Sequence, residues 1–123
     1  MEITIPTQVF RPFAEKRLKY VKGELTYYEN KISKAVNEYE QELKVYEASN
    51  WLKKLFKSKP EHPSKGFLTP YDSWQLSKSS MEIQADYVSQ VLSTLDHSDE
   101  ITLTKEDISY FNVLISIEHI KEA

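Results

Sequence analysis

The chain has 123 residues, of which 40% are hydrophobic and 28% charged, and its formal net charge is −3. This length suits one domain with a modest core, and the apolar share is too high for a wholly disordered chain. Two glycines and no cysteine argue against an all-β protein with many tight turns, a glycine-rich phosphate loop, disulfides and thiolate chemistry.

A short strand is the first predicted element. In "EITIPT" (2–7), Ile3 and Ile5 alternate with polar residues, and Pro6 ends the run. A near copy of this segment, "EITLTKEDISYF", occupies 100–111. Both copies predict a strand that runs into a helix. We expect the N-terminal strand and residues 100–104 to pair as a minor two-stranded β element.

One long amphipathic helix is predicted from Pro12 to about Lys57, because proline suits the first turn of a helix and a heptad pattern follows it. Gly23 is the one helix breaker inside, and the pattern leaves open whether the helix is continuous there. Apolar residues at steps of three and four form a seam: Leu18, Val21, Leu25, Tyr28, Ile32, Ala35 and Tyr39. The seam is longer than two short helices can cover, which predicts a homo-oligomer formed through this coiled-coil surface.

Residues 58–80 are predicted to be a proline-rich connector, since Pro60, Pro63 and Pro70 exclude a continuous helix. The connector is longer than an ordinary loop, which predicts a segment that is either functional or mobile.

Two shorter helices are expected after the connector. The first begins at a capping box of Ser79 and Glu82, and the second is capped by Thr104 and continues through the apolar run that ends near Ile120. The predicted fold is therefore mainly α, a single helical domain over 1–123.

The candidate catalytic and metal-binding residues do not form a recognisable site. His62, His97 and His119 lack the spacing of metal ligands on one helix face, and no serine lies in a nucleophile elbow. We expect neither a metal nor a cofactor, and we expect a protein that is not an enzyme.

The segment "NWLKKLFKSK" (50–59) places aromatic and aliphatic side chains opposite lysines. The favoured interpretation is the end of the long helix, where lysines complement the negative end of the helix dipole. The alternatives are a membrane-surface segment and a lysine cluster for phosphates. In the phosphate alternative, Lys53, Lys54 and Lys57 bind an anion or nucleotide next to the tyrosines of the long helix.

The connector also carries candidate anchors for a protein partner. Phe67, Tyr71 and Trp74 are expected to be exposed, and such aromatic residues dominate protein interfaces. Lysine far outnumbers arginine, which does not favour base-specific readout of duplex DNA.

The sequence therefore predicts a cytoplasmic, oligomeric helical binding protein. Its lysine-rich, cysteine-free composition resembles small proteins of phages and mobile elements, which favours binding and inhibition of a host protein. Two alternatives stay open: a sponge that sequesters a nucleotide signal in a Lys/Tyr-lined pocket between subunits, and a nucleic-acid-associated accessory protein. No segment is long and apolar enough to be predicted as a membrane span.

Overall fold

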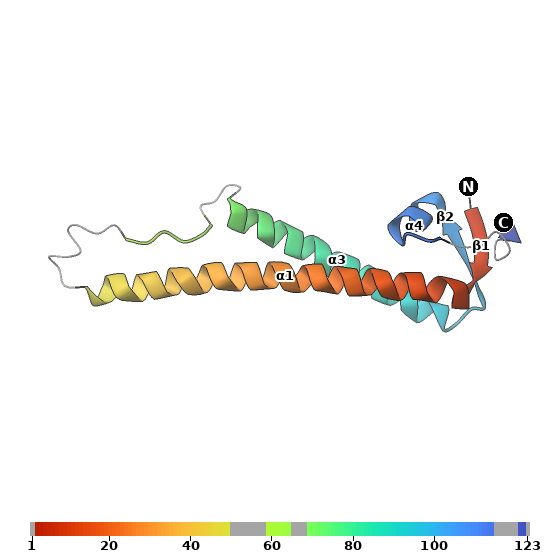
Figure 1. Cartoon of the computed structure of the whole chain (residues 1–123), viewed down its shortest axis with the longest axis horizontal. Helices are drawn as coiled ribbons and strands as arrows, with labels where there is room; N and C mark the ends of the chain where they lie inside the picture. The colour runs from red at the N-terminus through yellow and green to blue at the C-terminus, as the bar shows by residue number, and fades with distance from the viewer. Residues whose placement is uncertain (1, 50–58, 65–68, 115–120, 123) are drawn as a thin grey trace. The chain divides into compact units, whose positions relative to one another are not determined.

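The computed structural model describes residues 2–49, 59–64, 69–114 and 121–122. Most of them are helical, as predicted (Figure 1). The elements in chain order are β1 (Glu2–Pro6), α1 (Thr7–Ala48), α3 (Pro70–Leu95), β2 (Glu100–Thr104), α4 (Lys105–Tyr110) and β3 (Lys121–Glu122).

The sheet has β1 at its centre, with β2 and β3 antiparallel on either side. Ile3 lies opposite Leu103, and Ile5 lies opposite Ile101, so that the apolar residues of both strands share one face. The predicted pairing of the N-terminus with residues 100–104 is therefore confirmed. The short strand β3, which pairs with residues 3–4, was not expected from the sequence.

Helix α1 has 42 residues and is continuous through Gly23, the point that the sequence left open. It begins at Thr7, so the start predicted at Pro12 is wrong. The Thr7 N–H donates to the Asp99 carbonyl at 3.0 Å, and its hydroxyl donates to the Ser98 carbonyl at 3.0 Å. These bonds hold the first residue of the helix against the segment that leads into β2. At its other end α1 stops at Ala48, and residues 50–58 lie outside the described residues.

Helix α3 begins at Pro70, so the connector predicted over 58–80 is too long and the start predicted at Ser79 is wrong. Thr69 and Asp72 form the actual cap: the Asp72 N–H donates to the Thr69 hydroxyl at 3.2 Å, and the Thr69 N–H donates to the Asp72 carboxylate at 3.2 Å. Pro70 stands at the first helical position, where its missing N–H costs nothing. Proline here starts the helix that it was expected to prevent.

Helix α4 is capped by Thr104 as predicted, and Asp107 completes a capping box with it, but the helix ends at Tyr110 instead of continuing towards Ile120. Asn112 adopts a left-handed conformation with φ 53°, which asparagine tolerates better than most residues. The Val113 N–H then donates to the Ile108 carbonyl at 3.0 Å, which closes a Schellman-type helix end. Residues 115–120 lie outside the described residues.

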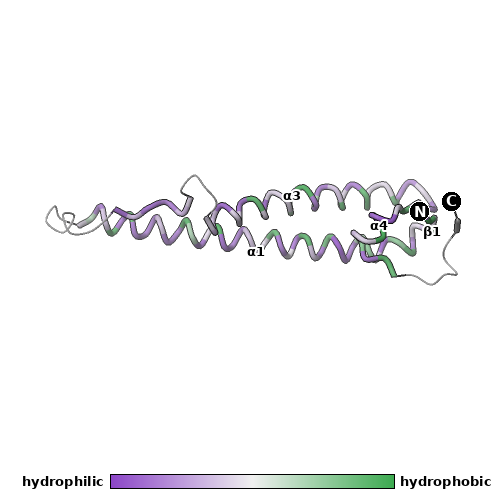
Figure 2. Tube along the Cα trace, turned by 90° about the horizontal axis from the view of Figure 1, so that it is seen from above, coloured by the Kyte–Doolittle hydropathy of each residue, from purple (hydrophilic) through white to green (hydrophobic). Residues whose placement is uncertain are grey.

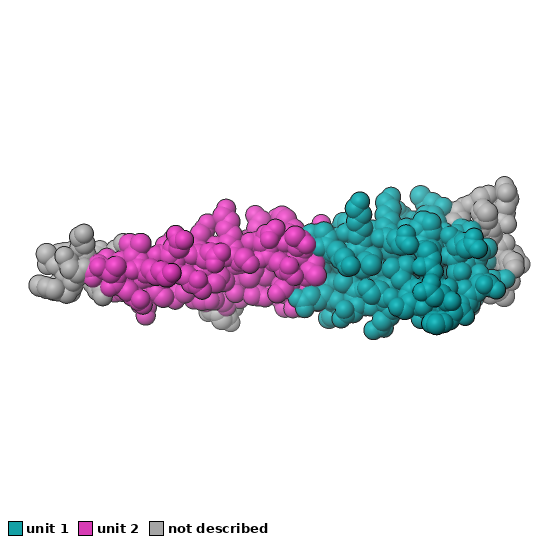
Figure 3. Space-filling model, turned by 90° about the horizontal axis from the view of Figure 1, so that it is seen from below, with its two compact units in different colours: residues 1–23, 81–123 teal, residues 24–80 magenta. Residues whose placement is uncertain are grey.

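The described residues form two compact units (Figure 3). Unit 1 comprises residues 1–23 and 81–123, and unit 2 comprises residues 24–80.

Figure 2 shows hydrophilic and hydrophobic residues alternating along α1, as the seam pattern predicts. The core of unit 1 is formed by residues from the sheet and all three helices or their ends: Ile3, Ile5, Phe10, Ala14, Val88, Leu95, Leu103, Phe111 and Val113.

Candidate functional site

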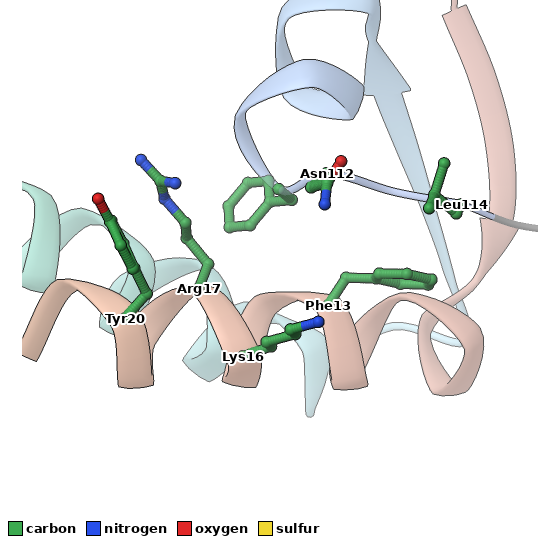
Figure 4. A pocket seen from close by; sticks show the side chains of 7 residues that line it. Phe13, Lys16, Arg17, Tyr20, Asn112 and Leu114 are labelled. Atoms are coloured by element: carbon green, nitrogen blue, oxygen red, sulfur yellow. The ribbon is translucent and has the colours of Figure 1, made fainter. Parts of the chain in front are cut away.

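A pocket of about 280 Å³ lies in unit 1, between the first turns of α1 and the segment that follows α4. Side chains of α1 form one wall, and Asn112 and Leu114 lie across from them (Figure 4). The left-handed turn at Asn112 ends α4 and leads the chain past this wall. The lining residues are Phe13, Lys16, Arg17, Tyr20, Phe111, Asn112 and Leu114.

Arg17 is the most constrained polar side chain of the pocket. Its guanidinium carbon lies 4.2 Å from the ring centroid of Tyr110 and 5.1 Å from that of Tyr20. Nη2 donates to the Gln84 side-chain oxygen at 3.4 Å, which is a long hydrogen bond. The Nε atom is buried and has no hydrogen-bond partner among the described residues. A buried N–H without an acceptor costs about 1–3 kcal/mol, so this atom needs an explanation.

Lys16 brings a second positive charge to the same pocket. Its side chain is exposed, so the ammonium group is held less tightly than the guanidinium group of Arg17. None of the seven described lining residues carries a carboxylate. The pocket therefore offers two cations without an acid among its own walls to neutralise them.

The inner wall of the pocket is aromatic. The Phe111 side chain is only 3% exposed, and its ring meets Phe10 edge-on at 4.9 Å and Tyr110 at 5.0 Å. Tyr87 stacks beside Phe111 with 6.3 Å between the ring centroids. Burial raises the pKa of the Tyr87 hydroxyl, and the nearby Asp107 carboxylate raises it further, so this ring stays neutral. The wall presents ring surface without negative charge.

This arrangement can bind an anion that also has an apolar or aromatic part. Cationic side chains form charge-assisted hydrogen bonds with oxyanions, and the rings give a surface for stacking. These residues were not predicted from the sequence as a site. A signal was nevertheless present, because Phe13, Arg17 and Tyr20 follow a spacing of four and three and so share one face of a helix.

The aromatic anchors predicted for a protein partner lie elsewhere, in unit 2. Tyr71 and Trp74 are half-buried in the first turns of α3, so the expectation that they are exposed residues of a connector is wrong. The reason is the cap at Thr69, which starts α3 before them. The third anchor, Phe67, lies outside the described residues.

Tyr71 and Trp74 instead contact side chains of unit 2. The Tyr71 ring lies 5.6 Å from that of His62, and the Tyr71 hydroxyl accepts a hydrogen bond from Gln75 at 3.0 Å. The Lys31 ammonium group lies 5.9 Å from the Trp74 ring. These contacts give both residues a role in holding unit 2 together.

The predicted anion site of Lys53, Lys54 and Lys57 lies outside the described residues. The seam predicted on the long helix does mark its less exposed face. Val21 is buried, and the other residues of the predicted oligomer seam are half-buried: Leu18, Leu25, Tyr28, Ile32 and Tyr39. Part of this seam is covered by the same chain, since Leu18 packs against the core of unit 1 and Tyr39 contacts His62 at 5.1 Å.

A second polar cluster surrounds the start of α3. The Asp72 carboxylate accepts hydrogen bonds from the hydroxyls of Ser64 at 2.7 Å and Thr69 at 2.8 Å. These bonds lower the pKa of Asp72, because they stabilise its ionised form. Thr69 belongs to the cap and Ser64 lies in the segment before it, so the cluster is accounted for by the start of the helix.

Metal ligands and membrane spans were also sought among the residues that the structure describes. Within residues 2–49, 59–64, 69–114 and 121–122, no group of three or more histidine or acidic side chains could hold a metal ion. Over the same ranges, no helix combines the length and the apolar character that crossing a membrane requires. The pocket beside Arg17 is therefore the strongest candidate site in the described part of the chain.

Comparisons with known proteins give no further guide to this site. No protein-family model matches the chain, and neither a curated protein nor a solved structure matches it. The chemistry of the pocket is therefore the basis on which a function can be assigned.

Proposed function

We propose that this chain is a non-enzymatic binding protein that holds a small organic anion in the pocket beside Lys16 and Arg17. The observation that carries the proposal is the pair of cationic side chains, Lys16 and Arg17, in a pocket whose described lining residues include no carboxylate. An anion would supply the negative charge that these walls lack. Lys16 would add attraction at the exposed side of the pocket.

The proposal resembles the nucleotide-sponge alternative in its chemistry but differs in its location. It uses a pocket within unit 1 of one chain, whereas the sequence pointed to lysines 53, 54 and 57 between subunits. Tyrosines next to a cation are common to both hypotheses. A second copy of the chain is not needed to complete the pocket.

A titration of isotope-labelled protein with acetate, inorganic phosphate, benzoate and phenyl phosphate tests the proposal. At least one anion should shift the amide signals of residues 13–20 and 111–114 in a saturable way. Added salt should weaken the binding, because it screens the exposed Lys16 charge. If none of the four anions shifts these signals, the pocket does not bind small anions and the proposal is wrong.

Lys16→Gln and Lys19→Gln form a matched pair for this titration, since both lysines are exposed on α1 but only Lys16 lines the pocket. Lys16→Gln should weaken anion binding about two- to five-fold, the range expected when an exposed charge contributes about 0.5–1 kcal/mol. Lys19→Gln should leave the affinity unchanged. Equal effects of the two substitutions would indicate general charge attraction instead of a defined site.

A protein partner is the second candidate function. On α3, within unit 1, Ile83 is 70% exposed and Tyr87 is 44% exposed one turn later. Exposed apolar side chains that lie next to one another favour an interface with a host protein or with a second copy. Native mass spectrometry separates these outcomes: a multiple of 14.4 kDa indicates self-association, whereas a mass of 14.4 kDa leaves the surface for another protein. Ile83→Glu should abolish an interface of either kind.

A further inference from the structure

The guanidinium group of Arg17 is engaged by aromatic rings, which limits how an anion can reach it. The rings of Tyr110 and Tyr20 lie 4.2 and 5.1 Å from its central carbon. A guanidinium group stacked on rings makes its hydrogen bonds through N–H groups that lie in its own plane. One of these, Nε–H, is buried and so is closed to a ligand. An acceptor therefore has to approach the terminal N–H groups in the guanidinium plane, as a carboxylate does in forked pairs.

The walls favour a ligand with a ring. Phe13, Tyr20 and Phe111 all line the pocket, and Phe111 already packs edge-on against Phe10 and Tyr110 at centroid distances of 4.9 and 5.0 Å. Aromatic rings attract further rings at about 4.5–7 Å in stacked or edge-on geometry. A planar ligand would extend this cluster from its open side.

The size of the pocket suits a ligand with one ring. Its volume of about 280 Å³ falls just below the range of roughly 300–1,000 Å³ that is usual for drug-sized ligands. A six-membered ring with one small charged group suits this volume. A nucleotide needs room for a base, a sugar and a phosphate, and is less suitable.

We infer that the pocket takes a monocyclic aromatic carboxylate. The assignment rests on the proposed function, because it names the class of anion that the same site would hold. The carboxylate lies in the plane of the Arg17 guanidinium group and accepts from its terminal N–H groups, since Nε–H is buried. The ring packs along Phe13 and Tyr20, and Lys16 faces the carboxylate from the exposed side.

Three probes of similar size test this assignment on the full chain: benzoate, cyclohexanecarboxylate and benzamide. Benzoate has the ring and the charge, cyclohexanecarboxylate keeps the charge without a planar ring, and benzamide keeps the ring without the charge. Benzoate should bind with a Kd of about 1 mM or tighter, a range reasonable for so few heavy atoms. Cyclohexanecarboxylate should bind at least about five-fold more weakly, and benzamide at least about ten-fold more weakly.

The outcomes separate this assignment from the proposed function. Equal binding of benzoate and cyclohexanecarboxylate would overturn the aromatic assignment and leave an anion-binding protein. Equal binding of benzoate and benzamide would overturn both, because the cations would then contribute nothing. Binding of phosphate or acetate with no response to benzoate would also overturn the assignment alone. The absence of any response to all of these anions would overturn the proposed function.

Two substitutions sharpen the test. Arg17→Lys keeps the positive charge but loses the planar fork, and it should weaken benzoate at least about five-fold. Phe13→Leu keeps an apolar side chain but removes a ring, and it should reduce the preference for benzoate over cyclohexanecarboxylate. If Arg17→Lys does not fold, Phe13→Leu and the three probes still show whether the pocket prefers an aromatic carboxylate. Unchanged selectivity in Phe13→Leu would contradict stacking on this wall, and Lys19→Gln serves as the control.

Discussion

The two units of the molecule are stabilised in different ways. Every fully buried side chain among the described residues belongs to unit 1, including Ile5, Phe10 and Leu103. Within residues 24–49, 59–64 and 69–80 of unit 2, no side chain is fully buried. Helical periodicity in a sequence therefore does not show whether the side chains of a helix will be fully buried in a core.

The difference follows from what each unit has to pack. Unit 1 combines a sheet with helical segments, and together they enclose side chains from several sides. The helical parts of unit 2 are residues of α1 and α3, and each helix has one apolar stripe to cover. Unit 2 therefore depends on half-buried contacts, such as the Tyr39–His62 ring pair and the Lys31–Trp74 contact.

Truncating one aromatic side chain in each unit should give the largest contrast. Phe10→Ala removes a fully buried ring and should lower the free energy of unfolding by about 3–5 kcal/mol. Trp74→Ala removes a larger but only partly buried side chain and should cost less, about 2 kcal/mol, through lost burial and the lost contact with Lys31. Chemical denaturation measures both values.

Equal costs for these two variants would remove the contrast between the units. A large loss for Trp74→Ala would make Trp74 a core residue of unit 2. It would also remove that residue from the predicted set of partner anchors.

Hydrogen exchange should show the same contrast without a mutation. Amides that pair β1 with β2 should exchange about a hundred-fold more slowly than helical amides of residues 24–48, because helices without buried contacts open locally. Mass spectrometry of peptic fragments resolves these regions. Uniform protection would mean that both units open only when the whole chain unfolds.

Gly23→Ala tests how much the glycine destabilises α1 at the position where the first segment of unit 1 ends. Gly23 lies inside the continuous helix α1, and a Cβ atom built on it meets no atom within 4 Å. Alanine should therefore stabilise the protein by about 0.5–1 kcal/mol, since glycine has the higher conformational entropy when unfolded. A higher melting temperature confirms the expectation, and destabilisation would show that this position needs glycine for another reason.

The smallest expected effect is a pH dependence at the start of α3. The folded pKa of Asp72 lies below its ordinary value of 3.8, so its hydrogen bonds stabilise the folded chain above that pH. This contribution is lost as the pH falls below 3.8 and through the folded pKa. In wild-type protein the amide signal of Thr69 should change over this window, and Asp72→Asn should abolish that change.

Asp86→Asn provides the control for this experiment, because Asp86 is an exposed carboxylate on the same helix. Its replacement should leave the pH profile of the Thr69 amide as it is in the wild type. Loss of the transition in both variants would show that Asp72 is not its source.

Periodic patterns in the sequence predicted the long helix, its less exposed face and the pairing of β1 with β2, because alternation and heptad spacing record burial directly. The helix ends were predicted less well. Pro70 and Asn112 decide two of them, one as a first helical residue and the other through its left-handed backbone. Both helix ends depend on local hydrogen bonds, and neighbouring residues of similar type could form such bonds equally well. The sequence alone therefore does not tell which residues form the cap.

The pocket could not be predicted from periodic patterns in the sequence. Phe13, Arg17 and Tyr20 share a helix face, which the sequence can indicate, but nothing in their spacing places Phe111 and Asn112 opposite them. That juxtaposition depends on β1 pairing with β2 and on the end of α4. A site formed by residues almost a hundred positions apart is a property of the fold.

The pairing of β1 with β2 also has a consequence for synthesis on the ribosome. Glu2 lies opposite Thr104, so β1 has to wait for β2 until nearly a hundred further residues have been translated. At typical elongation rates of about 5–20 residues per second, this delay is roughly 5–20 s. Unit 2 is contiguous in sequence and is translated in full during that interval, whereas Ile3 and Ile5 stay without their native partners. The unit with the better core is therefore the later of the two to be translated in full.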